Sequence, residues 1–143
     1  MAHKLGYQCK LMYKAGGHAA GGSYVELSNV RDVTLELTAA EADVTTRANN
    51  GWRATVSTLK EGTVTFSMVW DPADTGQDAI RTAFLGNSLI AFQVLDGASG
   101  EGLQADFNIM SFSRNEALAE AAMVDVTAKI AYSATAPSWL AGS

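Results

Sequence analysis

The residues best suited to chemistry in this sequence are three aspartates near its middle, Asp71, Asp74 and Asp78. Clustered carboxylates can bind a metal ion or act as a general acid and base. Their spacing differs from that of a calcium-binding loop. Pro72 lies among them and apolar residues at helical spacing follow, and both aspartate and proline are favoured where a helix begins. We therefore interpret these aspartates as residues that start a helix.

Other reactive side chains are few. The 143 residues include two histidines and one cysteine, so we expect neither a metal site with several such ligands nor an internal disulfide. No serine or cysteine stands in a motif with a histidine partner. The glycine-rich segment 97–102 leads into a predicted strand, so it is not a phosphate-binding loop. The sequence predicts no enzyme, catalytic residue, metal or cofactor; an unrecognised small-molecule site is the alternative.

The segment 43–53 is the strongest candidate for a binding surface. It is polar, lies between two predicted strands, and contains two arginines, one tryptophan and the pair Asn50-Gly51, which is typical of a tight turn. No apolar alternation surrounds Trp52, and aromatic and arginine side chains are enriched at interfaces. We interpret the segment as the tip of an assembly arm at about residues 38–60. The alternative is an ordinary loop whose tryptophan packs onto its own core.

A second candidate contact segment is the glycine-rich loop at 15–23. Its four glycines leave many backbone conformations to be fixed. We expect this loop to be mobile in the free subunit and to become ordered when a partner binds.

Alternation of apolar and polar residues predicts that most of the chain forms β-strands. In the clearest strand, 62–70, β-branched and aromatic residues dominate. The segment 24–37 is one long strand or two, with Val33, Leu35 and Leu37 facing inward. The segment 115–123 has helix-favouring composition and is ambiguous. The other predicted strands lie at 5–14, 53–60, 88–95, 103–113 and 124–132.

One helix is predicted at about residues 73–86. Ile80 and Phe84 lie at helical spacing, and Gly86 is a natural C-terminal stop. The expected fold class is mainly β (α+β): an antiparallel β-sandwich or barrel flanked by this short helix. We expect a single domain, 1–143, with flexible ends.

Composition excludes several classes of function. A hydrophobic fraction of 48% and a charged fraction of 17% are those of a globular protein. The formal net charge of −5 argues against stable binding to nucleic-acid phosphates. No apolar run is long enough to span a membrane, and the first residues lack the apolar core of a signal peptide.

Four segments, in order, resemble the tail tube (major tail) proteins of long-tailed bacteriophages, a family related to type VI secretion tube proteins. The most specific is 41–53, in which an acidic residue and a Thr-Thr-Arg run precede Gly51-Trp52-Arg53. The other three are the strand 29–37, the strand 62–71 and the helix 78–84. The resemblance covers the central two thirds of the chain.

The resemblance implies a structural subunit of the phage tail. Subunits would form hexameric rings that stack into a hollow tube, through which DNA passes without specific binding. The partners implied are other copies of the chain and tail proteins such as the tape measure, initiator and terminator, with no membrane involved. The protein would be made in the host bacterial cytoplasm and would reside in the virion tail.

The resemblance also assigns roles to residues. Carboxylates on a polar sheet face, Asp106 and Asp125, are candidates for facing a negative lumen that repels DNA. The alternatives to a phage tail tube are the tube of a contractile injection or secretion system, or a soluble β-sandwich binding module. The expected assembly-interface residues are Asp43, Thr45, Thr46, Arg47, Asn50, Gly51, Trp52 and Arg53.

Overall fold

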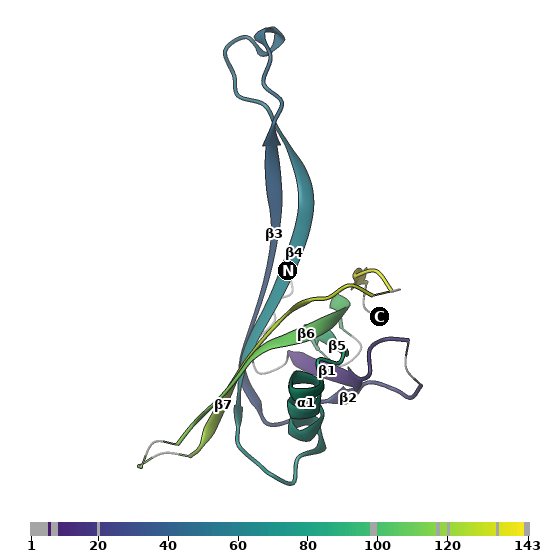
Figure 1. Cartoon of the computed structure of the whole chain (residues 1–143), viewed down its shortest axis with the longest axis vertical. Helices are drawn as coiled ribbons and strands as arrows, with labels where there is room; N and C mark the ends of the chain where they lie inside the picture. The colour runs from purple at the N-terminus through teal and green to yellow at the C-terminus, as the bar shows by residue number, and fades with distance from the viewer. Residues whose placement is uncertain are drawn as a thin grey trace.

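One long hairpin rises from a curled sheet in this computed structural model, and the α-helix α1 packs at the other end of the molecule (Figure 1). The structure describes residues 6, 9–19, 21–97, 100–116, 118–119, 121–133 and 135–141. Much of the two ends, which we expected to be flexible, lies outside these ranges. The elements are β1 (Lys10–Ala15), β2 (Val25–Glu26), β3 (Val30–Asp43), β4 (Thr55–Val69), α1 (Thr75–Gly86), β5 (Ile90–Leu95), β6 (Gly102–Asn115), β7 (Met123–Ile130) and β8 (Ser138–Leu140).

The strands form one antiparallel sheet in the order β2-β1-β5-β6-β7-β4-β3. Strand β8 pairs with the start of β6, beyond the part of β6 that pairs with β7. The prediction of a mainly β, antiparallel fold with one flanking helix is confirmed. The segment 24–37 forms two strands, of which β2 is very short.

The hydrophobic core lies on the face of the sheet that α1 covers. Phe92 stands between Phe66 and Phe107, with ring centroids 5.6 and 5.5 Å apart. These three rings come from β4, β5 and β6, so the core ties distant parts of the chain together. From the helix, Ile80 and Ala83 join the same buried cluster.

Helix α1 begins where the aspartates predicted it. The Asp74 side chain accepts a hydrogen bond from Gly76 N at 3.1 Å, and Asn87 ends the helix in the left-handed conformation. Buried Gln77 fixes the helix to the end of β4, because its side chain donates to Val69 O and accepts from Asp71 N.

The prediction of two separate strands at 53–60 and 62–70 is wrong, because the structure has one continuous strand there, β4. The strand continues through Gly62, although the alternation pattern predicts that a new strand begins at this residue. A Cβ at this position would lie 2.6 Å from Ile130 Cδ1 and 2.8 Å from Leu37 Cδ2. The glycine therefore makes room for two large side chains, and it does not end the strand.

Other inward positions were predicted wrongly. Val33 and Leu37 are exposed, because β3 is an edge strand and continues past the body of the sheet. Phe84 is also 37% exposed, whereas Ile80 is fully buried. In the segment 115–123, the residues that the structure describes form strand ends and a turn, with no helix.

Candidate functional site

The hairpin of β3 and β4 forms a protruding arm. Strand β4 pairs with β7 only from Thr63 onward, whereas its pairing with β3 continues to Asp43 and Thr55. Past Gly62 the hairpin is therefore a two-stranded ribbon that stands clear of the sheet (Figure 1). Two-stranded ribbons are marginally stable in water unless another surface packs on them.

Hydrogen bonds shape the base of the loop at the arm's end. The Thr45 hydroxyl lies 2.5 Å from Asp43 Oδ1 and accepts a hydrogen bond from Ala54 N at 2.9 Å. Thr45 N also donates to Asp43 Oδ1 at 2.9 Å. These hydrogen bonds from the side chain and backbone of Thr45 lower the pKa of the Asp43 carboxyl. Asp43 and Thr45 are both exposed, and their hydrogen bonds close the base of the loop.

A tight turn forms the tip. Trp52 N donates to Asn49 O at 3.0 Å, and the two residues between them, Asn50 and Gly51, have φ angles of 53° and 84°. The predicted Asn-Gly turn is confirmed. Positive φ at both positions suits asparagine and glycine and would strain most other residues.

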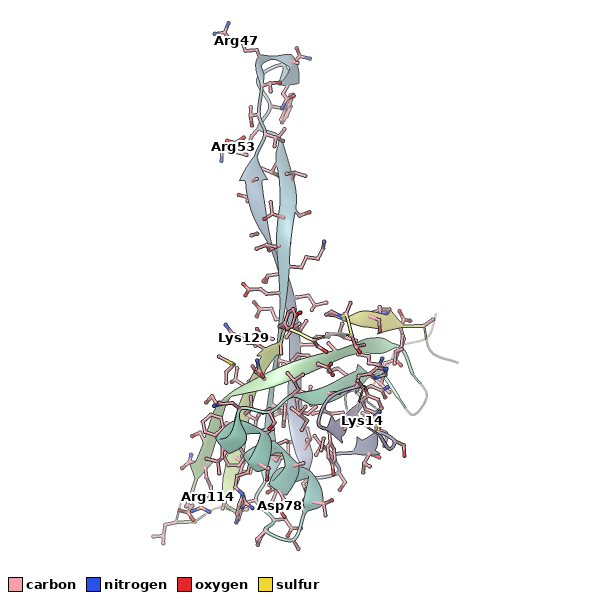
Figure 2. All side chains as sticks on the ribbon, turned by 45° about the vertical axis from the view of Figure 1, so that its right-hand side comes forward. Lys14, Arg47, Arg53, Asp78, Arg114 and Lys129 are labelled. Carbon is pink, nitrogen blue, oxygen red and sulfur yellow. The ribbon has the colours of Figure 1, made fainter. Side chains whose placement is uncertain are left out.

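Seven of the eight predicted interface residues lie in this loop at the far end of the arm, and the eighth, Asp43, is the last residue of β3. Trp52 is 78% exposed, which contradicts the alternative that it packs onto its own core. Arg47 and Arg53 project from the same side of the arm (Figure 2). Within the described ranges neither arginine forms an ion pair. That these residues contact another subunit stays a prediction.

The sheet face opposite α1 is polar and rich in hydroxyl groups. Cross-strand pairs on it join Thr63 with Lys129, Thr65 with Thr127, and Ser67 with Asp125. Directly opposed residues of an antiparallel pair share one face. Asp125 is exposed on this face, so its carboxylate can interact with solvent or with a molecule that lies against the face.

Asp106 does not lie on this exposed surface, and the prediction that it faces a lumen is wrong. It is 2% exposed because the glycine-rich loop covers it. His18 N donates to Asp106 Oδ1 at 2.6 Å, and the Ser133 hydroxyl contacts Oδ2. Burial, and secondarily the charge of Asp106, raises the pKa of Tyr24 to about 12. The loop at 15–23, expected to await a partner, is thus hydrogen-bonded to its own subunit.

The three aspartates of the helix start have structural partners. Asp71 accepts from Ala73 N, Asp74 caps α1, and Asp78 pairs with Arg81 at 3.0 Å. In the part of the chain that the structure describes, no group of three or more His, Cys, Asp or Glu side chains could hold a metal ion. The helix found there is too short and too polar to cross a membrane.

One surface feature has no counterpart in the sequence analysis. A groove of about 1120 Å³ lies between the start of β1, the connection from β2 into β3, the β5–β6 turn and Trp139. Trp139 belongs to β8, and its indole N–H donates to Glu101 Oε1 at 2.6 Å. Sequence patterns could not reveal the groove, because its walls come from four separate segments of the chain.

Comparisons with solved structures show where this fold recurs. The tail of an empty gene transfer agent (GTA) particle, refined with C6 symmetry, matches with a TM-score of 0.80 at 22% identity, over 97% of this chain and 100% of that one. The SPP1 tail tube matches with a TM-score of 0.79 at 16% identity, over 99% and 80%. The anti-feeding prophage baseplate matches with 0.68 at 5% identity, over 99% and 97%. At these identities the likeness shows the fold alone.

Family assignment rests on the sequence. No curated protein matches the chain. The family model described as phage tail tube protein matches residues 10–134. Because that match spans most of the 143 residues, the chain belongs to the phage tail tube protein family.

Proposed function

We propose that this tail tube subunit assembles into six-membered rings, which stack into the hollow tube of a virion tail through which DNA is delivered. The observation that carries the proposal is the arm, a two-stranded ribbon that ends in an exposed tryptophan and in two arginines that form no ion pair with any described residue. Such a ribbon gains stability when a second surface covers it. The C6 symmetry of the similar GTA tail supports six subunits per ring.

The arm makes the contact between subunits in this proposal. Trp52, Arg47 and Arg53 supply the aromatic and cationic anchors, and Thr45 and Asp43 hold the loop that presents them. Thr46, Asn50 and Gly51 complete the contact surface. A contact between an arm and a different patch on the next copy is head-to-tail, and head-to-tail contacts generate closed rings or open helical stacks.

The polar sheet face lines the lumen in this proposal. It is rich in threonine and serine, and its exposed carboxylates Glu36 and Asp125, which would repel phosphates, outnumber its exposed cation Lys129. A chain with a net charge of −5 gives DNA few cationic partners. DNA would therefore pass without specific binding. The subunits would be made in the host cytoplasm, and tape measure, initiator and terminator proteins would complete the tail.

Electron microscopy tests the proposal most directly. We expect negative-stain images of the concentrated protein to show six-membered rings or hollow tubes. Size-exclusion chromatography with light scattering should show mass that rises with concentration. A protein that stays monomeric, with no rings or tubes even when tail initiator proteins are added, would contradict the proposal.

Replacing the exposed tryptophan tests the arm itself. Trp52→Ala should leave the melting temperature of the subunit unchanged and should strongly reduce assembly, because the side chain has almost no contact within its own chain. Leu85→Ala is the matched control, since Leu85 is 72% exposed on α1 and should assemble normally. Circular dichroism and microscopy would be compared. A Trp52→Ala protein that is unfolded would place the tryptophan in the core instead.

A second candidate is the tube of a contractile injection system. The fold likeness to the anti-feeding prophage baseplate favours it. Imaging of particles from the source would separate the two, because a contractile tail surrounds its tube with a sheath.

A further inference from the structure

The groove described above lies where the curled sheet brings its two edge strands near each other. Lys10 and Glu26 line one side, from β1 and β2, and the start of β3, including Asp32 and Val33, lines the other. Lys10 and Glu26 form an ion pair across 3.2 Å. The groove is therefore built from both edges of the sheet and is open to solvent.

The groove combines an apolar wall with an excess of negative charge. Val33 and Trp139 are 37% and 55% exposed, so apolar surface lies open in it. Among the described residues Asp32 forms no ion pair, which leaves its charge uncompensated. The carboxylates that line the groove outnumber the cations by four to two: Glu26, Asp32, Asp96 and Glu101 against Lys10 and Arg31.

The end of the arm has the complementary character. Residues 44–54 contain two arginines and no acidic residue. Arg47 and Arg53 project from one side, and Trp52, the aromatic residue of the loop, is 78% exposed. A tryptophan flanked by arginines suits an apolar wall rimmed by carboxylates, because stacking and charge pairing act together.

The arm of one subunit cannot enter its own groove. The groove is lined by the first residues of β3, and the arm is the far end of that same strand. A strand advances about 3.3 Å per residue, so the six residues beyond Leu37 alone carry the loop about 20 Å from the body. The occupant with matching chemistry must therefore come from another copy.

We propose that the groove receives the arm loop of a second copy of this chain, with Trp52 packed on the apolar wall and Arg47 and Arg53 facing the carboxylates. The proposal rests on the proposed function and names the receiving surface. Since each subunit has one arm and one groove, each links to two neighbours, and the linkage propagates through the assembly.

The native Cys9 lines the groove and allows a crosslinking test. Ala48→Cys places a second thiol in the arm loop, at an exposed position. The concentrated full-length variant is treated with a short bis-maleimide, separated on a denaturing gel, and imaged in parallel. Arm-to-groove links should produce a ladder of dimers, trimers and larger chains.

Two control variants test whether the crosslink joins the arm loop to Cys9. Adding Cys9→Ser to the Ala48→Cys chain should abolish everything above the dimer, because arm-to-arm links alone can join only two chains. Ala121→Cys places an exposed thiol just before β7, away from the arm, and should give no ladder with Cys9.

The outcomes separate this inference from the proposed function. Tubes together with a Cys9-dependent ladder support both. Tubes without a ladder, or a ladder that survives Cys9→Ser, overturn the groove as the receiving surface and leave the tube subunit standing. Neither tubes nor ladder in the presence of initiator proteins overturns both.

Discussion

At the scale of single residues, Asp106 shows how a polar side chain can organise a loop. Its carboxylate holds His18 N on one oxygen and Ser133 on the other, and it thereby ties the glycine-rich loop to the segment after β7. Gly17 lies over it with φ of +96°, and a Cβ there would lie 3.3 Å from Asp106 Oδ1. The glycine is needed both for its backbone angle and for the close approach to the carboxylate.

Tyr24 should make stability depend on alkaline pH. Burial and the neighbouring Asp106 raise its pKa to about 12 in the folded protein, whereas a tyrosine in the unfolded chain ionises near about 10. A raised pKa means that the contribution of Tyr24 is complete below pH of about 10 and is lost as the pH rises toward about 12. The free energy of unfolding, measured in urea, should fall more steeply across this interval in the wild type than in Tyr24→Phe.

Asp106→Asn is the companion variant for that titration. It removes the charge and keeps an acceptor for His18, so the pKa of Tyr24 should fall toward its ordinary value, as followed by phenolate absorbance. Burial is the larger cause of the shift, so the pKa should stay above about 10. An unchanged titration would mean that the charge of Asp106 does not act on Tyr24.

Among the secondary-structure elements, the arm and the helix differ in how many of their residues are buried. From Ala39 to Lys60 the arm has no buried residue, whereas α1 buries Ile80, Ala83 and Gln77 against the sheet. We therefore expect the helix to determine the stability of the subunit and the arm to determine its assembly.

The arm can be removed without touching the core. Ala39 pairs with Lys60, so a two-residue Asn-Gly turn in place of residues 40–59 suits the antiparallel geometry. The melting temperature should stay close to that of the wild type, because only exposed or half-exposed residues are lost. Tubes should be absent in negative stain. Normal tubes from this shortened protein would contradict the role proposed for the arm.

Two helix residues that look equivalent in the sequence should differ in their effect on stability. Ile80→Ala should lower the free energy of unfolding by about 2–5 kcal/mol, because it empties a fully buried site. Phe84→Ala should cost about 1 kcal/mol or less, because that ring is 37% exposed. Urea denaturation of both variants measures the difference, and equal losses would show that Phe84 packs as deeply as Ile80.

In the molecule as a whole, the two faces of the sheet differ in their residues. One face carries the aromatic core and the helix, and the other presents threonine, serine and a few charged groups. A single continuous sheet with one polar face can line a channel while its other face stabilises the subunit. Its two edge strands line the groove. Its longest hairpin extends away from the body of the sheet (Figure 1).

The charge on the polar face should determine whether the tube retains DNA. Wild-type tubes should not retain a short DNA duplex at low salt, because the face offers few cations. Asp125→Lys adds a cation to each subunit and removes an anion, so retention in a gel-shift assay should rise and should fall again with added salt. Asp78→Lys is the control with the same change of charge, since Asp78 lies on α1, on the other side of the sheet. Equal retention by both variants would place Asp125 outside the lumen.

Sequence patterns predict the mainly β fold, the helix with its aspartate cap and the Asn-Gly turn, whereas the tail tube family is predicted from the resemblance of four segments. The fold class, the helix start and the turn depend on local patterns, such as alternation, capping and turn chemistry, that neighbouring residues specify. The exposed position of Trp52 also followed from the lack of apolar residues around it.

Which polar and apolar side chains are covered depends on contacts between segments that are distant in the sequence. Asp106 alternates onto the polar face, but a loop 88 residues away in the sequence buries it. Leu37 continues an inward pattern and is exposed, because β3 leaves the body of the sheet before the pattern ends. Gly62 lies within a strand because Leu37 and Ile130 converge on it. Burial depends on which distant segments meet, and that information is not contained in the periodicity of any one segment.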